Sequence, residues 1–559
     1  MEVLKADIVA GIAVGAVLIP QSIAYAELAG LPAVYGLYAA LLPPVVAAFF
    51  GSSRQLSTGP VAIASLISAT TIWELAPPDM ATYIAYSIML AALVGVMRLC
   101  LGVLRLGILV NLLSGTAIIG FVNAAAVIIA TSQLHDVLGV SARTGNFHFE
   151  TIWYTLLAAS HQVHWPTLAM ALLSAAIVFL LRRRTWKVLL AVSVTTALSW
   201  IAGYEGGIVG ALPAGLPTFA IPQLDFTVIP KLAVGAAVMT LIGLVETAAV
   251  TKTIATKTRQ QLDLNQELVG QGLASLVGSL FQGYAVSSSF FRSALNLSSG
   301  AKTGFSSLVT SAVVMLTLLF LTPLFYHLPQ ATLAVIIMIA VLGLFRMQPA
   351  MTAWRVSRRD GVVALVTFLA TLAAAPKLHI GILIGITLSL IIYLHGTMRP
   401  HIAYLARHPD GPLVDAEANS LAIDQHIALI RFDGQLYYGV SSYFEDKVLE
   451  AVTRLPELKY IVIDSGSITR IDATGEQTLL RVVENVRAIG VDVYFTRAKE
   501  QFVAVLERAG TMNYIGRDHF FDWNQHALDH LWNQLGPSYQ ARSPLHMATP
   551  TSREGIWAI

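Results

Sequence analysis

Apolar runs long enough to cross a membrane recur along the chain from Ile8 to Tyr393, and they leave few choices for its fold. A helix needs about 20 mostly apolar residues to span the hydrocarbon core of a bilayer. Only 12% of the 559 residues are charged, whereas soluble globular domains average about 25%. We therefore predict a polytopic α-helical membrane protein, which excludes a water-soluble globular chain.

Hydropathy predicts a fixed set of apolar segments, two of them too short to cross a bilayer alone. The predicted segments are 8–26, 35–50, 57–72 (short), 83–101, 109–132, 166–181, 188–202, 232–250, 266–281, 288–297 (short), 306–325, 331–344, 362–375 and 380–394, fourteen in all.

Lysine and arginine gather in alternate connections between these segments, and such connections face the cytoplasm. An even number of spans then places both termini there. The first span directly follows Met1–Asp7 and is expected to serve as the insertion signal. The positive clusters are Arg98/Arg105, Arg182–Arg184 with Lys187, Lys252/Lys257/Arg259 and Arg346/Arg355/Arg358/Arg359, with Arg143, Lys231 and Lys377 as exceptions.

The two short segments open with similar small residues and lie about 230 positions apart, at Ser57–Val61 and Ser287–Phe291. Spans 8–26 and 232–250 are separated by a similar offset. Seven segments repeated in opposite orientation form the inverted repeat of many transporters, with substrate between two interrupted helices. The alternative is coincidence, because polar breaks are common in long membrane chains.

Val286–Asn296 carries four serines, an arginine and an asparagine inside a very apolar half of the chain. A short helix starting there places free N–H groups, the positive dipole end and Arg292 together, which makes an anion site. The alternatives are an ordinary polar loop and an arginine that merely extends to the cytoplasmic surface.

Glu246 lies deeper inside an apolar run than any other acid in the sequence. Burial favours the neutral form of a carboxyl group, so proton uptake near neutral pH is feasible here. The alternative is a structural ion pair with Arg292 or Lys252.

The composition changes at Pro400, which divides the chain into a membrane domain and a smaller soluble one. Alternating strand and helix patterns predict a small α/β domain. It has no nucleophile–base or metal-ligand pattern and no P-loop, so binding or assembly is expected rather than catalysis or ATP-driven transport. The predicted divisions are 1–399 for transport, 400–419 as linker, 420–536 for the α/β domain and 537–559 as a disordered tail.

Three motifs of the membrane domain resemble the sulfate permease (SulP) family of anion transporters. They are Asp7–Ala26, Gly51–Pro60 and Leu268–Ser275, and Asp464–Gly475 resembles the STAS domain of that family. The resemblance implies a seven-plus-seven inverted repeat of 14 transmembrane segments and a cytoplasmic STAS domain. It also implies a homodimer, and a core (8–72, 83–101, 232–297, 306–325) that moves against a gate formed by the remaining spans.

The same resemblance implies which residues contact the anion. Gln21 and Tyr25, one turn apart on the first span, can instead act as packing contacts between helices. The family commonly has a small polar residue before the arginine, and Phe291 replaces it here, so a ring beside the site can narrow selectivity. The implied anion-binding residues are Gln21, Tyr25, Thr58, Gly59, Pro60, Val61, Ser288, Ser289, Phe290, Phe291 and Arg292.

Two further roles follow from the resemblance. Glu246 occupies the place of a family acid associated with proton or sodium coupling, and we expect it to bind a co-transported proton. Thr474 occupies the place of a hydroxyl that is phosphorylated in soluble relatives; the alternative is a helix N-cap.

We therefore expect a secondary active anion transporter of the inner or plasma membrane, not an enzyme, without cofactor, metal or nucleic-acid partner. Its expected partners are a small anion, a proton or sodium ion, membrane lipid and a second copy of the chain. Sulfate with proton symport by an elevator-like mechanism is the default. Bicarbonate, dicarboxylate or chloride transport or exchange and uncoupled channel conduction are alternatives, and a membrane-anchored STAS regulator is a rival of another class.

Overall fold

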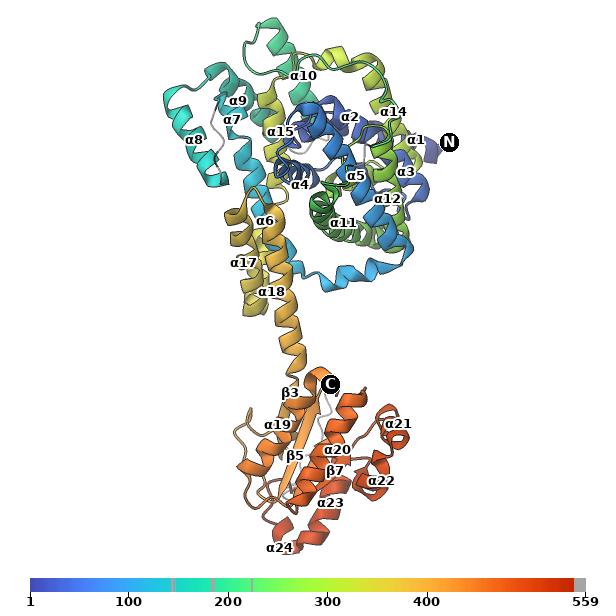
Figure 1. The fold of residues 1–559 in the computed structure, drawn as a ribbon, viewed down its shortest axis with the longest axis vertical. Helices are drawn as coiled ribbons and strands as arrows, with labels where there is room; N and C mark the ends of the chain where they lie inside the picture. Colours follow the sequence, from blue (N-terminus) through green and yellow to red (C-terminus); the bar gives the residue numbers. More distant parts are fainter. Residues whose placement is uncertain (142–144, 146, 182–185, 223–224, 547–559) are drawn as a thin grey trace. The chain divides into compact units, whose positions relative to one another are not determined.

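The computed structural model describes residues 1–141, 145, 147–181, 186–222 and 225–546. The chain forms two compact units, Met1–Leu390 and Ile391–Ile559 (Figure 1). Arg143 and the Arg182–Arg184 cluster of the orientation argument lie outside the described residues.

The first unit is built almost entirely from helices, the last of which, Leu378–Met398, continues past Leu390 into the second unit. Its elements are α1 (Glu2–Leu28), α2 (Val34–Leu41), α3 (Pro43–Phe50), β1 (Thr58–Gly59), α4 (Ala62–Trp73), α5 (Met80–Val103), η1 (Leu106–Leu112), α6 (Gly115–Ser132), α7 (Leu134–Leu138), α8 (His148–His161), α9 (Trp165–Leu180), α10 (Lys187–Ile201), α11 (Ile229–Thr258), α12 (Leu264–Leu280), β2 (Ser287–Ser288), α13 (Phe290–Ser298), α14 (Phe305–Leu316), η2 (Thr317–Leu321), η3 (Thr322–Phe325), α15 (Gln330–Leu342), α16 (Met347–Val356), α17 (Arg358–Ala374) and α18 (Leu378–Met398).

Within the described residues, seven helical stretches are long and apolar enough to cross a membrane. An eighth is obtained if α8 and α9, which meet at a bend of 116°, are counted as one span. The predicted segment 35–50 is divided into α2 and α3, and α3 begins at Pro43, a residue favoured in a first helical turn. The count of fourteen segments in two repeats remains a prediction.

Small residues allow the helices around the two short segments to approach closely, as is common between membrane helices. A Cβ added at Gly95 of α5 would lie 2.7 Å from Leu276 Cγ of α12. One added at Gly272 of α12 would lie 2.6 Å from the Leu99 nitrogen of α5. The two helices run side by side in Figure 1, and their backbones are therefore in near contact.

The second unit contains a six-stranded sheet in the order β4-β3-β5-β6-β7-β8. Strands β5 to β8 are parallel, and β3 pairs antiparallel with both β4 and β5. This confirms the predicted α/β domain. Its elements are β3 (His401–Arg407), β4 (Leu413–Asp415), β5 (Ile427–Asp433), α19 (Tyr438–Arg454), β6 (Tyr460–Asp464), α20 (Ala473–Ala488), β7 (Asp492–Thr496), α21 (Glu500–Ala509), α22 (Thr511–Ile515), η4 (Arg517–His519), β8 (Phe520–Phe521), α23 (Asn524–Leu535) and α24 (Pro537–Gln540).

The predicted linker 400–419 is not a linker, because it contains β3 and β4 of the sheet. Turn residues at 407–411 suggested a flexible connection, but such residues also join the strands of a hairpin. Ala403 and Leu405 of β3 are buried under α23, so this segment belongs to the folded core.

The predicted disordered tail is also wrong for residues 537–546. Leu545 is buried beside Trp532, and Tyr539 and Ser543 donate hydrogen bonds to the buried carboxylate of Asp424. The segment has little sequence pattern of its own, and its order comes from packing against the sheet. Residues 547–559 lie outside the described part of the chain.

Candidate functional site

The two short helices start beside a shared two-stranded crossing, a pairing that the sequence does not predict. Strands β1 and β2 pair antiparallel, with Thr58 opposite Ser288 and Gly59 opposite Ser287. The Ser289 N–H donates to the Ser57 carbonyl at 2.9 Å and extends the pairing. Helix α4 begins shortly after β1 and α13 directly after β2. Segments more than 200 residues apart are thereby joined at the N-terminal ends of both helices.

The start of α4 has backbone donors without acceptors in the described structure. Its residue Val61 makes no side-chain cap, and the first intrahelical bond is donated by Ser65 to the Val61 carbonyl. The N–H groups of Ala62, Ile63 and Ala64 therefore remain available, and all three residues are buried. At α13, Ser289 Oγ accepts from the Arg292 N–H at 3.3 Å.

Arg292 is buried at this crossing, with only 1% of its surface exposed. Its Nη1 donates to the Pro60 carbonyl at 2.9 Å, and its Nε donates to Ser57 Oγ at 3.4 Å. Nη2 has no partner among the described residues. A Cβ added at Gly59 would lie 3.4 Å from that nitrogen, so the glycine leaves space beside it. Such burial contradicts an arginine that extends to the surface, and Nη2 is a free cationic donor.

Gln21 and Tyr25 are both buried on α1. Neither side chain makes a hydrogen bond with a described residue, so neither serves as a polar link between helices there. Tyr25 is close enough to Arg292 and Tyr284 for the three groups to interact electrostatically. The structure therefore brings the phenol of α1 to the arginine of α13.

The rings of Phe290 and Phe291 point away from the buried crossing. They are 44% and 52% exposed, and the Arg346 guanidinium lies 5.6 Å from the centre of the Phe290 ring. Arg292 is buried while the two preceding side chains are exposed, and their backbone N–H groups lie at the helix start. The expected ring of Phe291 beside the anion therefore remains a prediction.

Several polar residues that hold the crossing together were not identified from the sequence. Gln271 Nε2 of α12 donates to Thr58 Oγ1 at 2.6 Å. Thr247 Oγ1 lies 3.0 Å from Ser288 Oγ, and Ser293 Oγ accepts from the Ser57 N–H at 2.8 Å. Gln271 lies in the predicted motif 268–275, which is the only signal that could have indicated it.

Glu246 lies beside the same crossing, where its Oε2 accepts from Ser287 Oγ at 3.3 Å. It forms no ion pair with Arg292 or Lys252 in the described structure, and Lys252 is exposed. The cation that interacts with it is Arg98 of α5. The alternative of an ion pair with Arg292 or Lys252 is therefore wrong.

Arg98 is not part of a cytoplasmic cluster, contrary to the orientation argument. Only 2% of it is exposed; Nη1 donates to the Val286 carbonyl at 2.7 Å and Nη2 to the Met239 carbonyl at 3.3 Å. It packs against Gly243, where any side chain would collide with it. Position in the sequence alone cannot reveal that this long side chain turns inward.

Thr474 is exposed in the first turn of α20 and is not the N-cap of that helix. The cap is Asp472, whose carboxylate accepts from the Gly475 N–H at 2.8 Å. The alternative of a threonine cap is therefore wrong, and the regulatory role of Thr474 remains a prediction.

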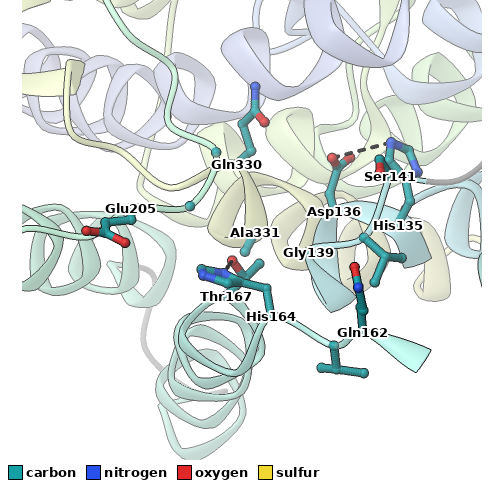
Figure 2. Close-up of a pocket in the computed structure, with 14 residues that line it drawn as sticks. His135, Asp136, Gly139, Ser141, Gln162, His164, Thr167, Glu205, Gln330 and Ala331 are labelled. Carbon is teal, nitrogen blue, oxygen red and sulfur yellow. Dashed lines mark hydrogen bonds and ion pairs between the residues drawn. The ribbon is translucent and has the colours of Figure 1, made fainter. Parts of the chain in front are cut away.

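The pocket in Figure 2, of about 520 Å³, lies between α7, the start of α9 and the start of α15. It contains the His135–Asp136 ion pair, at 3.3 Å. None of the predicted site residues lines it. Within the described residues, no group of three or more His, Cys, Asp or Glu side chains is placed to hold a metal ion. The crossing of β1 and β2, at the starts of α4 and α13, therefore remains the candidate site.

Each of the two units matches a known protein family. The sulfate permease family matches residues 4–367, and the STAS domain matches residues 420–526. An Arabidopsis thaliana protein named "Sulfate transporter 4.1, chloroplastic" is 33% identical over 546 residues, covering 93% of this chain and 79% of its own.

Two solved structures share the fold. The murine Solute Carrier 26 family member A9 anion transporter, described as inward-facing, has a TM-score of 0.84 at 24% identity and covers 95% of this chain and 92% of its own. The transmembrane domain of the cyanobacterial bicarbonate transporter BicA has a TM-score of 0.60 at 22% identity, over 68% and 97%.

Proposed function

Because the chain belongs to the sulfate permease family, we propose that it is a secondary active anion transporter, with sulfate as default substrate and proton symport as default coupling. The family is one of transporters rather than enzymes, and its named relatives and structural neighbours support anion transport. The substrate, the coupling and the mechanism are our proposals.

One observation carries the proposal: at the crossing of β1 and β2, a buried guanidinium nitrogen and the first N–H groups of α4 have no partner among the described residues. Arg292 Nη2 supplies charge, and the first N–H groups of α4 supply directed donors. Such groups hydrogen-bond an oxyanion strongly where water is excluded. We propose that Gln21 and Tyr25 of α1, a helix that packs against both α4 and α13, complete the site.

The identity of the anion is tested with purified protein in liposomes. Radioactive sulfate uptake is measured against unlabelled bicarbonate, dicarboxylate and chloride as competitors.

Arg292→Gln is expected to weaken sulfate binding at least about 10-fold, since hydrogen bonds to charged groups contribute about 1.5–3 kcal/mol. Arg355→Gln, at an exposed arginine of α16, is the matched control. Equal uptake by the two variants would refute the site.

Coupling is tested by imposing pH and sodium gradients on the same liposomes. We propose that Glu246 takes up the co-transported proton, because it lies beside β2 and within the field of Arg98. Glu246→Gln should exchange sulfate for sulfate but fail to concentrate it under a proton gradient. A Gln variant that still concentrates sulfate would exclude this role, and accumulation driven by sodium alone would favour sodium coupling. Flux without accumulation in the unmodified protein would favour a channel.

We further propose that the core moves against the gate as an elevator in a homodimer of the inner or plasma membrane, with cytoplasmic termini. The fold shared with an inward-facing anion transporter supports this architecture. Thiol labelling tests the orientation: in a Cys100→Ala background, a cysteine at Thr474 should react with an impermeant reagent only in inside-out vesicles. Reaction in right-side-out cells would reverse the assigned orientation.

A further inference from the structure

A second arginine is buried beside the proposed anion site, and the proposed function gives it no role. Arg98 of α5 is as deeply buried as Arg292. Two of its nitrogens bind carbonyl groups, while its Nε has no partner among the described residues. Burying a cation without a compensating negative charge costs free energy. We therefore looked for the negative group that compensates Arg98.

The charged groups around Glu246 can be assigned one by one. Helix α11 itself adds Lys231, Lys252 and Lys257, and all three are exposed. Helix α5 contributes Arg98, and α13 contributes Arg292. The Glu267 carboxylate of α12 accepts from the Ser52 and Ser53 N–H groups, each at 2.9 Å. The sequences of α4 and η1 contain no charged residue. Arg98 lies against Gly243, one turn before Glu246 on α11, and it is the cation whose charge acts on that carboxylate. We therefore take Arg98 and Glu246 as each other's counter-charges.

Both members of this pair hold adjacent residues of one segment. Arg98 binds the carbonyl of Val286, and Glu246 binds the hydroxyl of Ser287. Ser287 pairs with Gly59 across the crossing. A change in the charge of Glu246 therefore acts directly on β2, the strand that pairs with β1 at the starts of α4 and α13.

We propose that Arg98 is the counter-charge of Glu246 and that this pair sets the number of negative charges on the transported anion. The inference rests on the proposed function. With Glu246 ionised, Arg98 is neutralised and Arg292 alone compensates the anion, so the site accepts a monovalent anion. With Glu246 protonated, both guanidinium charges are uncompensated, and the site accepts a divalent anion. The proton is carried on the Glu246 carboxyl group and is released from it when the dianion leaves.

The test compares a divalent probe, sulfate, with a monovalent one, nitrate, in exchange across liposomes without a gradient, from pH 5 to pH 8. The unmodified protein should favour sulfate at acidic pH and nitrate at alkaline pH. Glu246→Gln, which keeps both arginine charges, should favour sulfate at every pH. Arg98→Gln should lose sulfate exchange at least 10-fold and exchange nitrate only at acidic pH.

The double variant Arg98→Gln/Glu246→Gln decides between this proposal and a structural role for Arg98. Only Arg292 then remains charged, so nitrate exchange should return and become independent of pH. Arg98→Lys, which keeps the charge, should retain the sulfate preference at acidic pH. If Arg98→Gln does not fold, the double variant, which leaves no unpaired carboxylate at position 246, and Arg98→Lys still carry the test.

The experiment distinguishes failure of the proposed transport function from failure of the proposed role of Arg98. Absence of any anion exchange by the unmodified protein would remove the proposed function. Exchange whose sulfate-to-nitrate ratio does not vary with pH, or a double variant that still prefers sulfate, would overturn the role of Arg98 and leave anion transport intact.

Discussion

Asp472 shows how one carboxylate can organise two elements. Its Oδ1 accepts from the Gly475 N–H at the start of α20, and its Oδ2 accepts from the Tyr438 N–H at the start of α19, at 3.0 Å. The first N–H groups of a helix have no intrahelical acceptor. One side chain therefore satisfies donors at two helix ends and ties them together.

Replacing Asp472 by Ala should destabilise the second unit by about 1–2 kcal/mol, the cost of losing an N-cap. Asp472→Asn, which keeps a capping oxygen, is the matched variant and should lose less. Urea unfolding of residues 391–546, with hydrogen exchange at the first turns of α19 and α20, measures the effect. Unchanged protection of both turns in the Ala variant would contradict the shared cap.

Asp492 gives the second unit a dependence on pH. Burial opposes its ionisation, but hydrogen bonds from His519 and Arg487 outweigh that cost and hold the pKa of Asp492 below its ordinary value. A carboxyl group with a lowered pKa stabilises the fold above its unfolded-state pKa, and the contribution disappears as the pH falls through the folded-state pKa.

Asp492→Asn should therefore lower stability at pH 7 by at most about 1 kcal/mol, because the group is partly exposed. The difference from the unmodified domain should shrink as the pH falls below about 4, the ordinary aspartate range. Urea midpoints at pH 7 and at pH 3 test this. A difference that is equal at both values would show that the carboxylate charge is not responsible.

At the scale of elements, close backbone contact fixes the position of α1. A Cβ added at Gly36 of α2 would overlap the Ser22 carbonyl oxygen of α1, and that oxygen belongs to rigid backbone. Ser22 lies beside Gln21 and one turn from Tyr25 on α1. The contact with α2 therefore sets where these two candidate residues lie.

Gly36→Ala should separate α1 from α2, cost about 1–3 kcal/mol as overpacking does, and reduce sulfate exchange by displacing Gln21 and Tyr25. Gly115→Ala, at a glycine whose added Cβ would meet nothing within 4 Å, is the control and should behave as the unmodified protein. Melting temperature in detergent and exchange in liposomes measure both effects. Equal behaviour of the two variants would contradict the tight contact.

Local pattern and packing contribute differently to each element. The start of α13 was predicted from four serines and an arginine in an apolar context, a strictly local signal. Strands β1 and β2 have two residues each and exist only because they pair with one another. No periodicity can reveal a strand of that length, so the register of the crossing could not be predicted.

At the scale of the whole molecule, the candidate site residues and the regulatory candidate are divided between the two units. Gln21 to Arg292 all lie in Met1–Leu390, and Thr474 lies in Ile391–Ile559. The rival view, a membrane-anchored regulator acting through its STAS domain, assigns the activity to the second unit. The two views can therefore be separated by dividing the chain.

A chain that ends at Met398 should still bind sulfate, because it contains every residue proposed to contact the anion. Sulfate should raise its melting temperature, as a ligand that binds only the folded state must. The same chain with Arg292→Gln is the control and should show no such rise. Loss of all activity on truncation, together with full activity of Arg292→Gln in the intact chain, would favour the regulator.

The sequence alone determined the properties that depend on the cost of burying each residue in its immediate context. Because polar and charged residues are costly to bury in a membrane, the sequence predicted the membrane helices and the two interrupted segments. For the same reason it marked Arg292 and Glu246 as unusual. Only the tertiary structure decided which distant group each polar side chain meets. It turned Arg98 inward to the Val286 carbonyl, gave the α20 cap to Asp472 and ordered residues 537–546 against the sheet. Partners that come from separate elements depend on packing, and a single segment carries no record of its neighbours.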